Sequence, residues 1–319
     1  MAYDYDPDLL PLIAYVPELD IADLGAARAL LDSMRVARPA FVLPDSVVLG
    51  KRRVPGRAGD PDVDVWVFSP RARTGLAPGL LYLHGGGFVL GDAEGEALTP
   101  AQAAEQVGAV VVSVEYRLAP ESPFPAAVED CCAVLRWMAE NAGELGIDPL
   151  RIAIGGQSAG AGLAAGVALL SRDRGGPRLC MQLLEIPVLD DRLDTPSMKT
   201  YTDTLLWNLP NAVKSWEYYL GPARDGLETS PYAAPARAGD LAGLPRAFVS
   251  VCEFDPLRDE GLQYAQRLVQ AGVATELHLY PGTFHGSSGV APQAATSLRM
   301  KRDWLDALRR GTAAVPTSS

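Results

Sequence analysis

The chain has 319 residues, 48% of them hydrophobic and 21% charged, so it can bury a large core, either as one domain with an elaboration or as two domains. Asp and Glu number 39 against 28 Lys and Arg, and the net charge of -11 argues against non-specific binding to nucleic acid or an anionic membrane. The acidic N-terminus does not resemble a signal peptide, and the apolar stretches are too short to span a membrane. The four cysteines form no C-x-x-C pair, which is usual for reduced cytosolic thiols, so we expect a cytoplasmic protein without membrane insertion.

From residue 46 onward the sequence alternates between apolar strands and helices, whereas residues 1–45 have no strand pattern and favour short helices, the best of them at 21–34. The alternation predicts an α/β fold with a mostly parallel sheet. Strands are expected at 47–49, 63–68, 79–83, 109–114, 152–154, 179–186, 246–252 and 275–280. Helices are expected at 97–107, 125–141, 159–170, 256–271 and 292–310.

The alternation stops between residues 188 and 243, a stretch rich in proline and aromatic residues with one expected helix at 211–220. We therefore divide the chain into an N-terminal segment (1–45), a core in two parts (46–187 and 244–319) and an insertion (188–243). In parallel sheets the reactive groups lie at the carboxyl ends of the strands. Each candidate below follows an expected strand.

The most informative motif is Gly156-x-Ser158-x-Gly160, which lies between an expected strand and an expected helix. This spacing is typical of a nucleophile elbow, in which a serine sits on a tight strand-to-helix turn. Glycines allow the helix to pack closely against the strand it leaves, and the helix N-terminus favours developing negative charge. The alternative is an ordinary connection whose glycines only permit the turn.

Two of the three histidines lie near the end of the chain, and they have different contexts. His278 alternates with Leu277 and Leu279 inside a strand, so we expect a solvent-side or satisfied strand residue. His285 follows that strand in a glycine-containing loop, where its near-neutral pKa suits a general base. The alternative for His285 is an exposed loop residue.

An acid must orient that imidazole, and Asp255 is the best candidate because it directly follows an expected strand. Asp followed by Pro is also a good helix start, so a purely structural role is a strong alternative. Glu253 and Asp259 are rival acids. The order Ser158, Asp255, His285 favours Asp255, because it matches the Ser…Asp…His order of α/β-hydrolases.

The run His84-Gly85-Gly86-Gly87 follows another expected strand. Consecutive glycines allow backbone N–H groups to converge on one point, as an oxyanion hole requires. We expect the donors to be Gly86, Gly87 and Ala159, with Gly85 shaping the loop and His84 bracing it. A flexible or phosphate-cradling loop is the alternative, although the loop lacks G-x-G-x-x-G spacing and a following Lys-Ser/Thr pair.

Taken together, these motifs resemble the hormone-sensitive-lipase-like (family IV) branch of α/β-hydrolases, and within it the bacterial heroin-esterase-like acetyl esterases. The matching segments are 84–88, 115–121, 156–160, 255–261 and 284–286, with weaker similarity at 185–187 and 215–221. One departure is Gln157, where many members have Asp.

The resemblance implies an eight-stranded α/β-hydrolase sheet with a helical cap formed by residues 1–45 and the insertion. It also implies carboxylesterase activity on short acyl esters of small molecules, no cofactor, no metal and a possible homodimer. Ser158 would attack the ester, His285 would transfer protons, and Asp255 would orient His285.

Four apolar residues are candidates for the substrate pocket, although each is equally compatible with the core: Phe88, Leu206, Trp207 and Phe284.

Two further functions are compatible with the fold. A small-molecule receptor is disfavoured because it has no need for the base. An amidase or peptidase would use the same three side chains.

Overall fold

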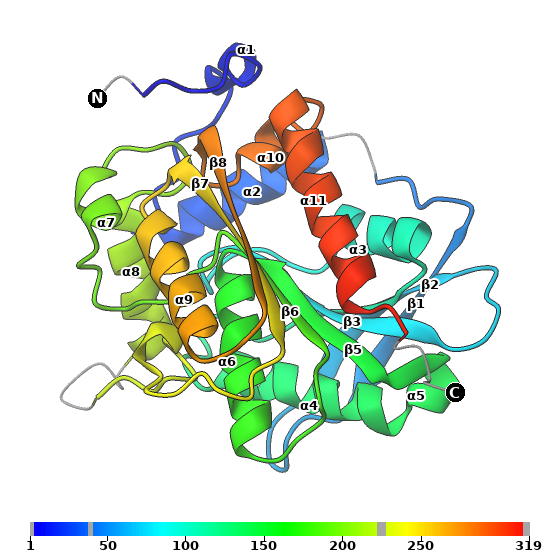
Figure 1. The fold of residues 1–319 in the computed structure, drawn as a ribbon. Coiled ribbons are helices and arrows are strands. Elements are labelled where there is room, and N and C mark those ends of the chain that lie inside the picture. The colour runs from blue at the N-terminus through cyan, green and yellow to red at the C-terminus, as the bar shows by residue number, and fades with distance from the viewer. Residues whose placement is uncertain (1–2, 38–40, 222–227, 315–319) are drawn as a thin grey trace.

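An eight-stranded sheet forms the centre of the computed structural model, which describes residues 3–37, 41–221 and 228–314. The strand order is β1-β2-β4-β3-β5-β6-β7-β8, with β1 and β2 antiparallel to their neighbours and the remaining strands parallel (Figure 1). The strands are β1 (Val47–Val54), β2 (Val63–Pro70), β3 (Ala77–Leu83), β4 (Val110–Val114), β5 (Ile147–Gln157), β6 (Met181–Glu185), β7 (Arg246–Phe254) and β8 (Thr275–Phe284). The predicted α/β fold and its mostly parallel sheet are confirmed.

The main differences from the expected strands concern length. β1 runs to Val54 because its exposed, basic second half pairs with β2, and such a polar edge carries no apolar signal. β5 begins five residues earlier than expected, since Ile147 pairs with Ala77 before the register shifts. In contrast, β3 and β4 are buried at every residue, which explains why their apolar runs were recognisable.

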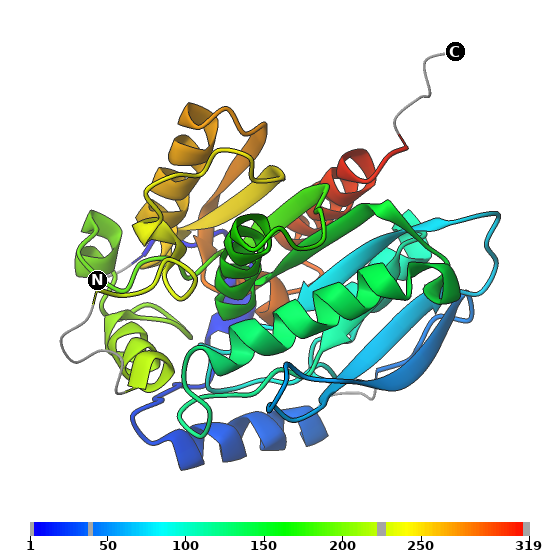
Figure 2. The same ribbon diagram turned by 90° about the horizontal axis from the view of Figure 1, so that it is seen from below.

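Helices cover both faces of the sheet (Figure 2). They are α1 (Leu10–Ile13), α2 (Leu24–Ala37), α3 (Leu98–Gln102), the π-helical turn η1 (Ala103–Val107), α4 (Ala126–Glu140), α5 (Ala142–Leu145), α6 (Ala159–Asp173), α7 (Pro196–Thr200), α8 (Leu209–Leu220), the 3₁₀ turn η3 (Pro235–Arg237), α9 (Arg258–Gln270), α10 (Ser287–Val290) and α11 (Ala295–Gly311). Among the described residues, no helix is both long and apolar enough to cross a membrane.

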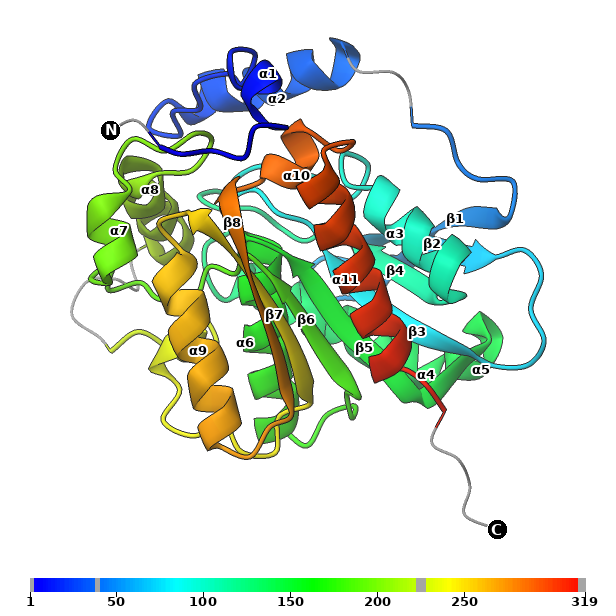
Figure 3. The same ribbon diagram turned by 45° about the horizontal axis from the view of Figure 1, so that its top comes forward.

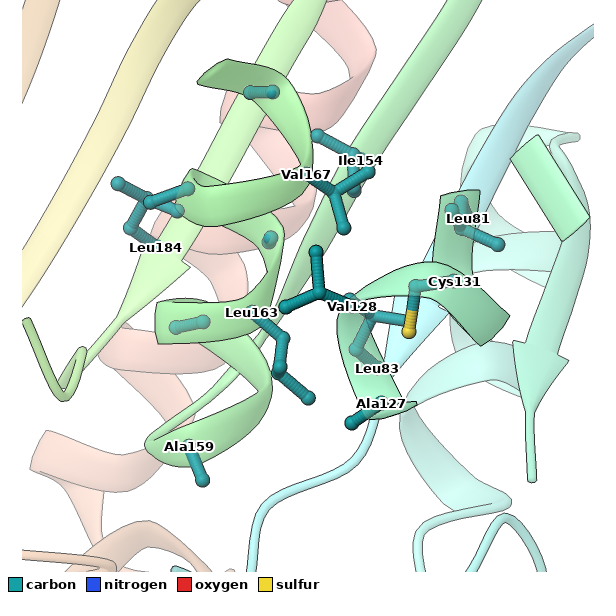
Figure 4. Packing of buried hydrophobic residues seen from close by; sticks show 14 of the residues in the cluster. Leu81, Leu83, Ala127, Val128, Cys131, Ile154, Ala159, Leu163, Val167 and Leu184 are labelled. Atoms are coloured by element: carbon teal, nitrogen blue, oxygen red, sulfur yellow. The ribbon is translucent and has the colours of Figure 1, made fainter. Parts of the chain in front are cut away.

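The core is divided by the sheet into two apolar layers. Alternate residues of β3 point to opposite faces: Leu81 and Leu83 belong to the larger cluster with α4, α6 and α9, whereas Leu80 packs with α11. Figure 4 shows Leu163 of α6 near Val128 of α4 in the larger cluster. This packing fixes α6, and therefore its N-terminus, against the middle of the sheet.

The N-terminal segment and the insertion are joined by hydrogen bonds although they are far apart in sequence. Asn211 of α8 accepts the N–H of Ile21 at 3.1 Å and donates to the Leu19 carbonyl at 2.7 Å. Arg28 of α2 donates to Glu121 of the core at 2.6 Å. Figure 3 shows α1 and α2 above the edge where β7 and β8 end, with α8 beside them.

Candidate active site

Ser158 lies on a sharp turn between β5 and α6. Its φ of 56° is in the left-handed region, where a non-glycine residue stores about 1–3 kcal/mol of strain. The end of β6 holds the turn, because the N–H of Ser158 donates to the Glu185 carbonyl at 2.8 Å and its carbonyl accepts the N–H of Val188 at 3.2 Å. The hydroxyl is thereby presented at the carboxyl edge of the sheet, directly before a helix.

The two glycines of the motif are required by a close approach to β3. A Cβ on Gly156 would lie 2.3 Å from the Leu83 carbonyl oxygen, and a Cβ on Gly160 would lie 2.1 Å from the same oxygen. The expected close approach of the helix to the strand it leaves, β5, is also present, since the same Cβ on Gly156 would lie 2.9 Å from the Gly160 carbonyl oxygen of α6. The neighbouring strand β3, against which the elbow is pressed, adds contacts that are closer still.

Ser158, His285 and Asp255 form one continuous chain of hydrogen bonds. The Ser158 Oγ lies 2.8 Å from His285 Nε2, and His285 Nδ1 lies 2.7 Å from Asp255 Oδ2. All three side chains are buried, with 6%, 6% and 1% of Ser158, His285 and Asp255 exposed, respectively. Because a carboxylate accepts at Nδ1, the imidazole carries its proton there and leaves Nε2 free to accept the serine proton.

The Asp255 carboxylate faces His285, whereas its alternative role as the first residue of a helix is wrong, because α9 begins at Arg258 with Leu257 at its N-cap. Asp255 Oδ1 accepts the N–H of Leu257 at 2.9 Å, one residue before α9 begins, while its Oδ2 faces His285. One oxygen of the carboxylate therefore closes the turn that precedes α9, and the other faces the imidazole. The bond to Leu257 in turn fixes the direction of the carboxylate.

The rival acids and the strand histidine have partners elsewhere. Glu253 accepts the N–H of Gly282 at 2.7 Å, and Asp259 accepts a backbone N–H of α7 at 2.8 Å. His278 is half-buried, and its Nε2 lies 2.8 Å from a Glu276 carboxylate oxygen, as expected for a satisfied strand residue.

His84 braces the glycine loop, as its position suggested. Its ring is fully buried and stacks on Tyr116 with centroids 4.1 Å apart, and burial lowers the pKa of His84 to about 4. Its Nδ1 lies 2.7 Å from the Gly85 carbonyl oxygen, which makes Nδ1 the donor. A neutral imidazole held in this way fixes the loop and transfers no proton near neutral pH.

Of the four residues expected at the oxyanion hole, Gly85 was expected to shape the loop rather than donate, and its N–H indeed donates elsewhere, to Glu96 Oε1 at 2.6 Å. Gly86 and Gly87 have φ values of 120° and 58°, which only glycine adopts readily. Ala159 is the first residue of α6, so its N–H has no partner within the helix. Gly86, Gly87 and Ala159 therefore remain as candidate donors, and Gly85 shapes the loop.

Glu96 is a site residue that the sequence analysis missed. It lies on the cavity wall, and its Oε2 accepts the Tyr82 hydroxyl at 2.8 Å while its Oε1 binds the Gly85 N–H. Burial, together with the nearby carboxylates of Glu185 and Asp92, raises the pKa of Glu96 to about 7, although the hydrogen bonds from Gly85 and Tyr82 oppose the rise. No sequence signal identifies Glu96, because Tyr82 and Gly85 come within hydrogen-bonding distance of it only in the folded chain.

A cavity of about 370 Å³ extends from Ser158 and His285 towards the N-terminal segment. Its wall is mostly apolar and includes Leu206 and Trp207, as expected. The other two pocket candidates lie outside this wall: Phe88 and Phe284 are 1% and 0% exposed. Both side chains pack in the apolar interior instead. The sequence could not show this, because an apolar residue type predicts burial but does not tell whether the side chain lines a cavity or packs behind its wall.

Comparisons with known proteins show the family to which this chain belongs. A family model described as alpha/beta hydrolase fold matches residues 80–288. Carboxylesterase NlhH from Mycobacterium tuberculosis (strain H37Rv) is 38% identical over 317 residues, which cover 96% of each chain. A solved bacterial heroin esterase is 49% identical with a TM-score of 0.95, covering 98% of this chain and 99% of that one. This chain is a hormone-sensitive-lipase-like α/β-hydrolase.

As a member of this family, the protein is a carboxylic-ester hydrolase. The hydrolase has Gln157 where many members have Asp, and the structure gives a local reason. Gln157 lies opposite Glu185 on the neighbouring strand β6, and its side chain opposes the rise in the pKa of this buried carboxyl that desolvation causes. An Asp at this position would place another carboxylate beside Glu185, whereas the Gln amide offers N–H donors.

In this hydrolase, Glu96→Gln should change stability in a pH-dependent way. The pKa of Glu96 lies at about 7 in the folded protein, above its ordinary value of 4.5, so the folded state binds this proton more tightly. The stability that protonated Glu96 contributes is therefore lost as the pH rises from about 4.5 to about 7. Glu96→Gln removes the charge, keeps an acceptor for Gly85, and should gain in Tm relative to wild type as the pH rises.

Thermal unfolding at a pH of about 5 and about 8 measures this difference. Glu94→Gln, at an exposed carboxylate two residues away, is the matched control and should show no such trend. An equal Tm difference for Glu96→Gln at both pH values would contradict a raised pKa at this carboxyl.

Proposed function

We propose that this ester hydrolase cleaves short-chain, acetyl-like esters of small molecules through Ser158, His285 and Asp255. The observation that carries the proposal is the continuous hydrogen-bond chain from Ser158 Oγ to His285 at 2.8 Å and from His285 to Asp255 at 2.7 Å. Nucleophile, base and orienting acid are thereby already in their working order in the free protein.

The first half of the reaction forms an acyl-enzyme. His285 Nε2 accepts the proton of Ser158 as the serine oxygen attacks the ester carbonyl. Asp255 holds the Nδ1–H tautomer and stabilises the imidazolium that forms. His285 then donates the proton to the departing alcohol. In the second half, His285 accepts a proton from a water molecule as that water attacks the acyl-serine ester. His285 then donates this proton to the Ser158 oxygen, and the acid leaves.

The negative charge of the tetrahedral intermediate would be held by the backbone N–H groups of Gly86, Gly87 and Ala159. Support comes from their positions: both glycines line the cavity that contains Ser158, and Ala159 is the first residue of α6. The positive end of a helix dipole favours an oxyanion at this point.

Residues 1–45 and 188–243 would form the cap that shapes the substrate site. The cavity wall takes Tyr15, Leu30 and Met34 from the first segment and Leu206 and Trp207 from the second. A mostly apolar cavity of about 370 Å³ suits a neutral ester of modest size. The names of the relatives, a carboxylesterase and a heroin esterase, are consistent with small-molecule esters.

An acyl-chain series tests the substrate class. We expect kcat/KM for p-nitrophenyl acetate and butyrate to exceed that for the dodecanoate by roughly tenfold or more, because a long acyl chain exceeds the length of a cavity of about 370 Å³. Steady-state rates over the series measure this. A maximum at the dodecanoate would overturn the short-chain proposal, and faster turnover of p-nitroacetanilide than of the acetate ester would indicate an amidase.

A further inference from the structure

The insertion helix α8 makes a direct hydrogen bond to the glycine loop of the active site. Ser215 Oγ donates to the Gly87 carbonyl oxygen at 2.8 Å, across 128 residues of sequence, and the Ser215 side chain is fully buried. A serine within a helix commonly bonds its own backbone or solvent. Here the hydroxyl leaves the helix and holds the loop that carries two of the candidate oxyanion donors.

The loop needs such a restraint because its backbone is strained. Gly87 and Phe88 follow one another with φ values of 58° and 65°. Glycine adopts this conformation readily, but phenylalanine does so at a cost. Rotating the Gly87–Phe88 peptide would relieve that strain, since the rotation changes the φ of Phe88. The bond from Ser215 to the oxygen of this same peptide opposes the rotation.

The rest of α8 holds Phe88 in place. The ring of Phe88 stacks on Tyr219 with centroids 3.9 Å apart and an interplanar angle of 10°, and it lies 5.6 Å from Trp216. Ser215, Trp216 and Tyr219 come from little more than one helical turn. One short stretch of the insertion therefore contacts both the peptide oxygen and the side chain of the strained segment.

The glycine loop also packs closely against the insertion at Gly87. A Cβ placed on Gly87 would lie 3.3 Å from Ser215 Oγ and 2.5 Å from the Trp207 ring. Both neighbours belong to the insertion, so the loop has no room to move towards it. Movement of the loop away from the insertion is opposed by a hydrogen bond to the core, in which the Phe88 carbonyl accepts the N–H of Ala119 at 3.0 Å.

We infer that Ser215 is a positioning residue for the oxyanion hole: its hydroxyl fixes the Gly87 peptide so that the Gly86 and Gly87 N–H groups converge beside Ser158. This inference rests on the proposed function and adds that the insertion takes part in catalysis as well as shaping the pocket. An oxyanion hole acts through preorganised donors, and small displacements of catalytic groups are costly. Ser215 itself touches neither the ester nor the reacting atoms.

Ser215→Ala tests the inference, with Ser171→Ala as the matched control. Ser171 is also a buried helical serine that donates to a backbone carbonyl, that of Pro177 at 2.9 Å, but it lies roughly 20 Å along α6 from Ser158. For p-nitrophenyl acetate, Ser215→Ala should lower kcat about tenfold and leave KM within about twofold. Ser171→Ala should lower Tm by a similar amount and leave kcat unchanged.

The affinity for a trifluoromethyl ketone inhibitor should not change if Ser215 only stabilises the fold. The inhibitor forms an oxyanion adduct with the serine, so its Ki should rise in Ser215→Ala by the same factor as kcat falls. Ser215→Cys, whose S–H is a poor donor of similar size, should behave like Ser215→Ala and serves if the alanine variant does not fold. Ser215→Thr, which keeps the hydroxyl, should recover most of the lost kcat.

These experiments distinguish a failure of the inference about Ser215 from a failure of the proposed function. If wild type hydrolyses the ester through Ser158 but Ser215→Ala matches Ser171→Ala in kcat and in inhibitor affinity, the role of Ser215 is overturned and the proposed function stands. If wild-type turnover does not depend on Ser158, the proposed function fails first, and the inference about Ser215 falls with it.

Discussion

Ser158→Ala is expected to lower kcat for p-nitrophenyl acetate by about 10⁶-fold, the cost of removing the nucleophile in other serine hydrolases. The only group lost is the Oγ that lies 2.8 Å from His285. Alanine has the same Cβ as serine, and the strained φ of 56° is imposed by backbone bonds to Glu185 and Val188 that the substitution leaves in place.

We therefore expect the variant to fold with an almost unchanged Tm, so that the loss of activity cannot be assigned to unfolding. Steady-state kinetics and thermal unfolding on the same preparation measure both quantities. Retention of more than about one thousandth of wild-type turnover would remove Ser158 from the mechanism, since the remaining groups alone do not support that rate.

The second large effect is expected for Asp255→Asn, which should lower kcat about 10⁴-fold. Asn keeps a carbonyl oxygen for the Leu257 N–H, so the turn that precedes α9 is preserved. Its NH₂ group would then face His285 Nδ1 and favour the tautomer with the proton on Nε2. That tautomer cannot accept the proton of Ser158.

Asp259→Asn is the matched control for this prediction. Asp259 lies on the first turn of the same helix and accepts a backbone N–H from α7, but it is not part of the hydrogen-bond chain to Ser158. We expect its kcat to change by less than about tenfold. Equal losses in the two variants would show that the acid acts through the helix rather than through His285.

The sheet and the three central side chains were predictable because their signals are local. A strand such as β3, buried at every residue, appears in the sequence as an uninterrupted apolar run. Ser158, Asp255 and His285 each directly follow a parallel strand, and the carboxyl ends of such strands meet at one edge. Strand order along the chain therefore placed residues that are 30 to 127 positions apart at one site.

The supporting residues were not predictable, because their roles depend on long-range partners. Glu96 is one acid among many until Gly85 and Tyr82 are brought to it. Ser215 is a helix serine whose partner lies 128 residues away. Phe88 was expected in the pocket, yet its positive φ turns the ring towards α8 and away from the cavity.

The central claim is tested most directly by finding which residue a serine-directed organophosphonate modifies. The enzyme is incubated with an alkyl fluorophosphonate until esterase activity is lost, and the adduct is located by digestion and tandem mass spectrometry. The reagent reacts fastest with an activated serine, because the phosphonyl adduct mimics the tetrahedral intermediate. We predict one adduct per chain, on Ser158, appearing at the rate at which activity disappears and absent from Ser158→Ala. Loss of activity with Ser158 unmodified, or an adduct on another residue that tracks the loss, would contradict the account.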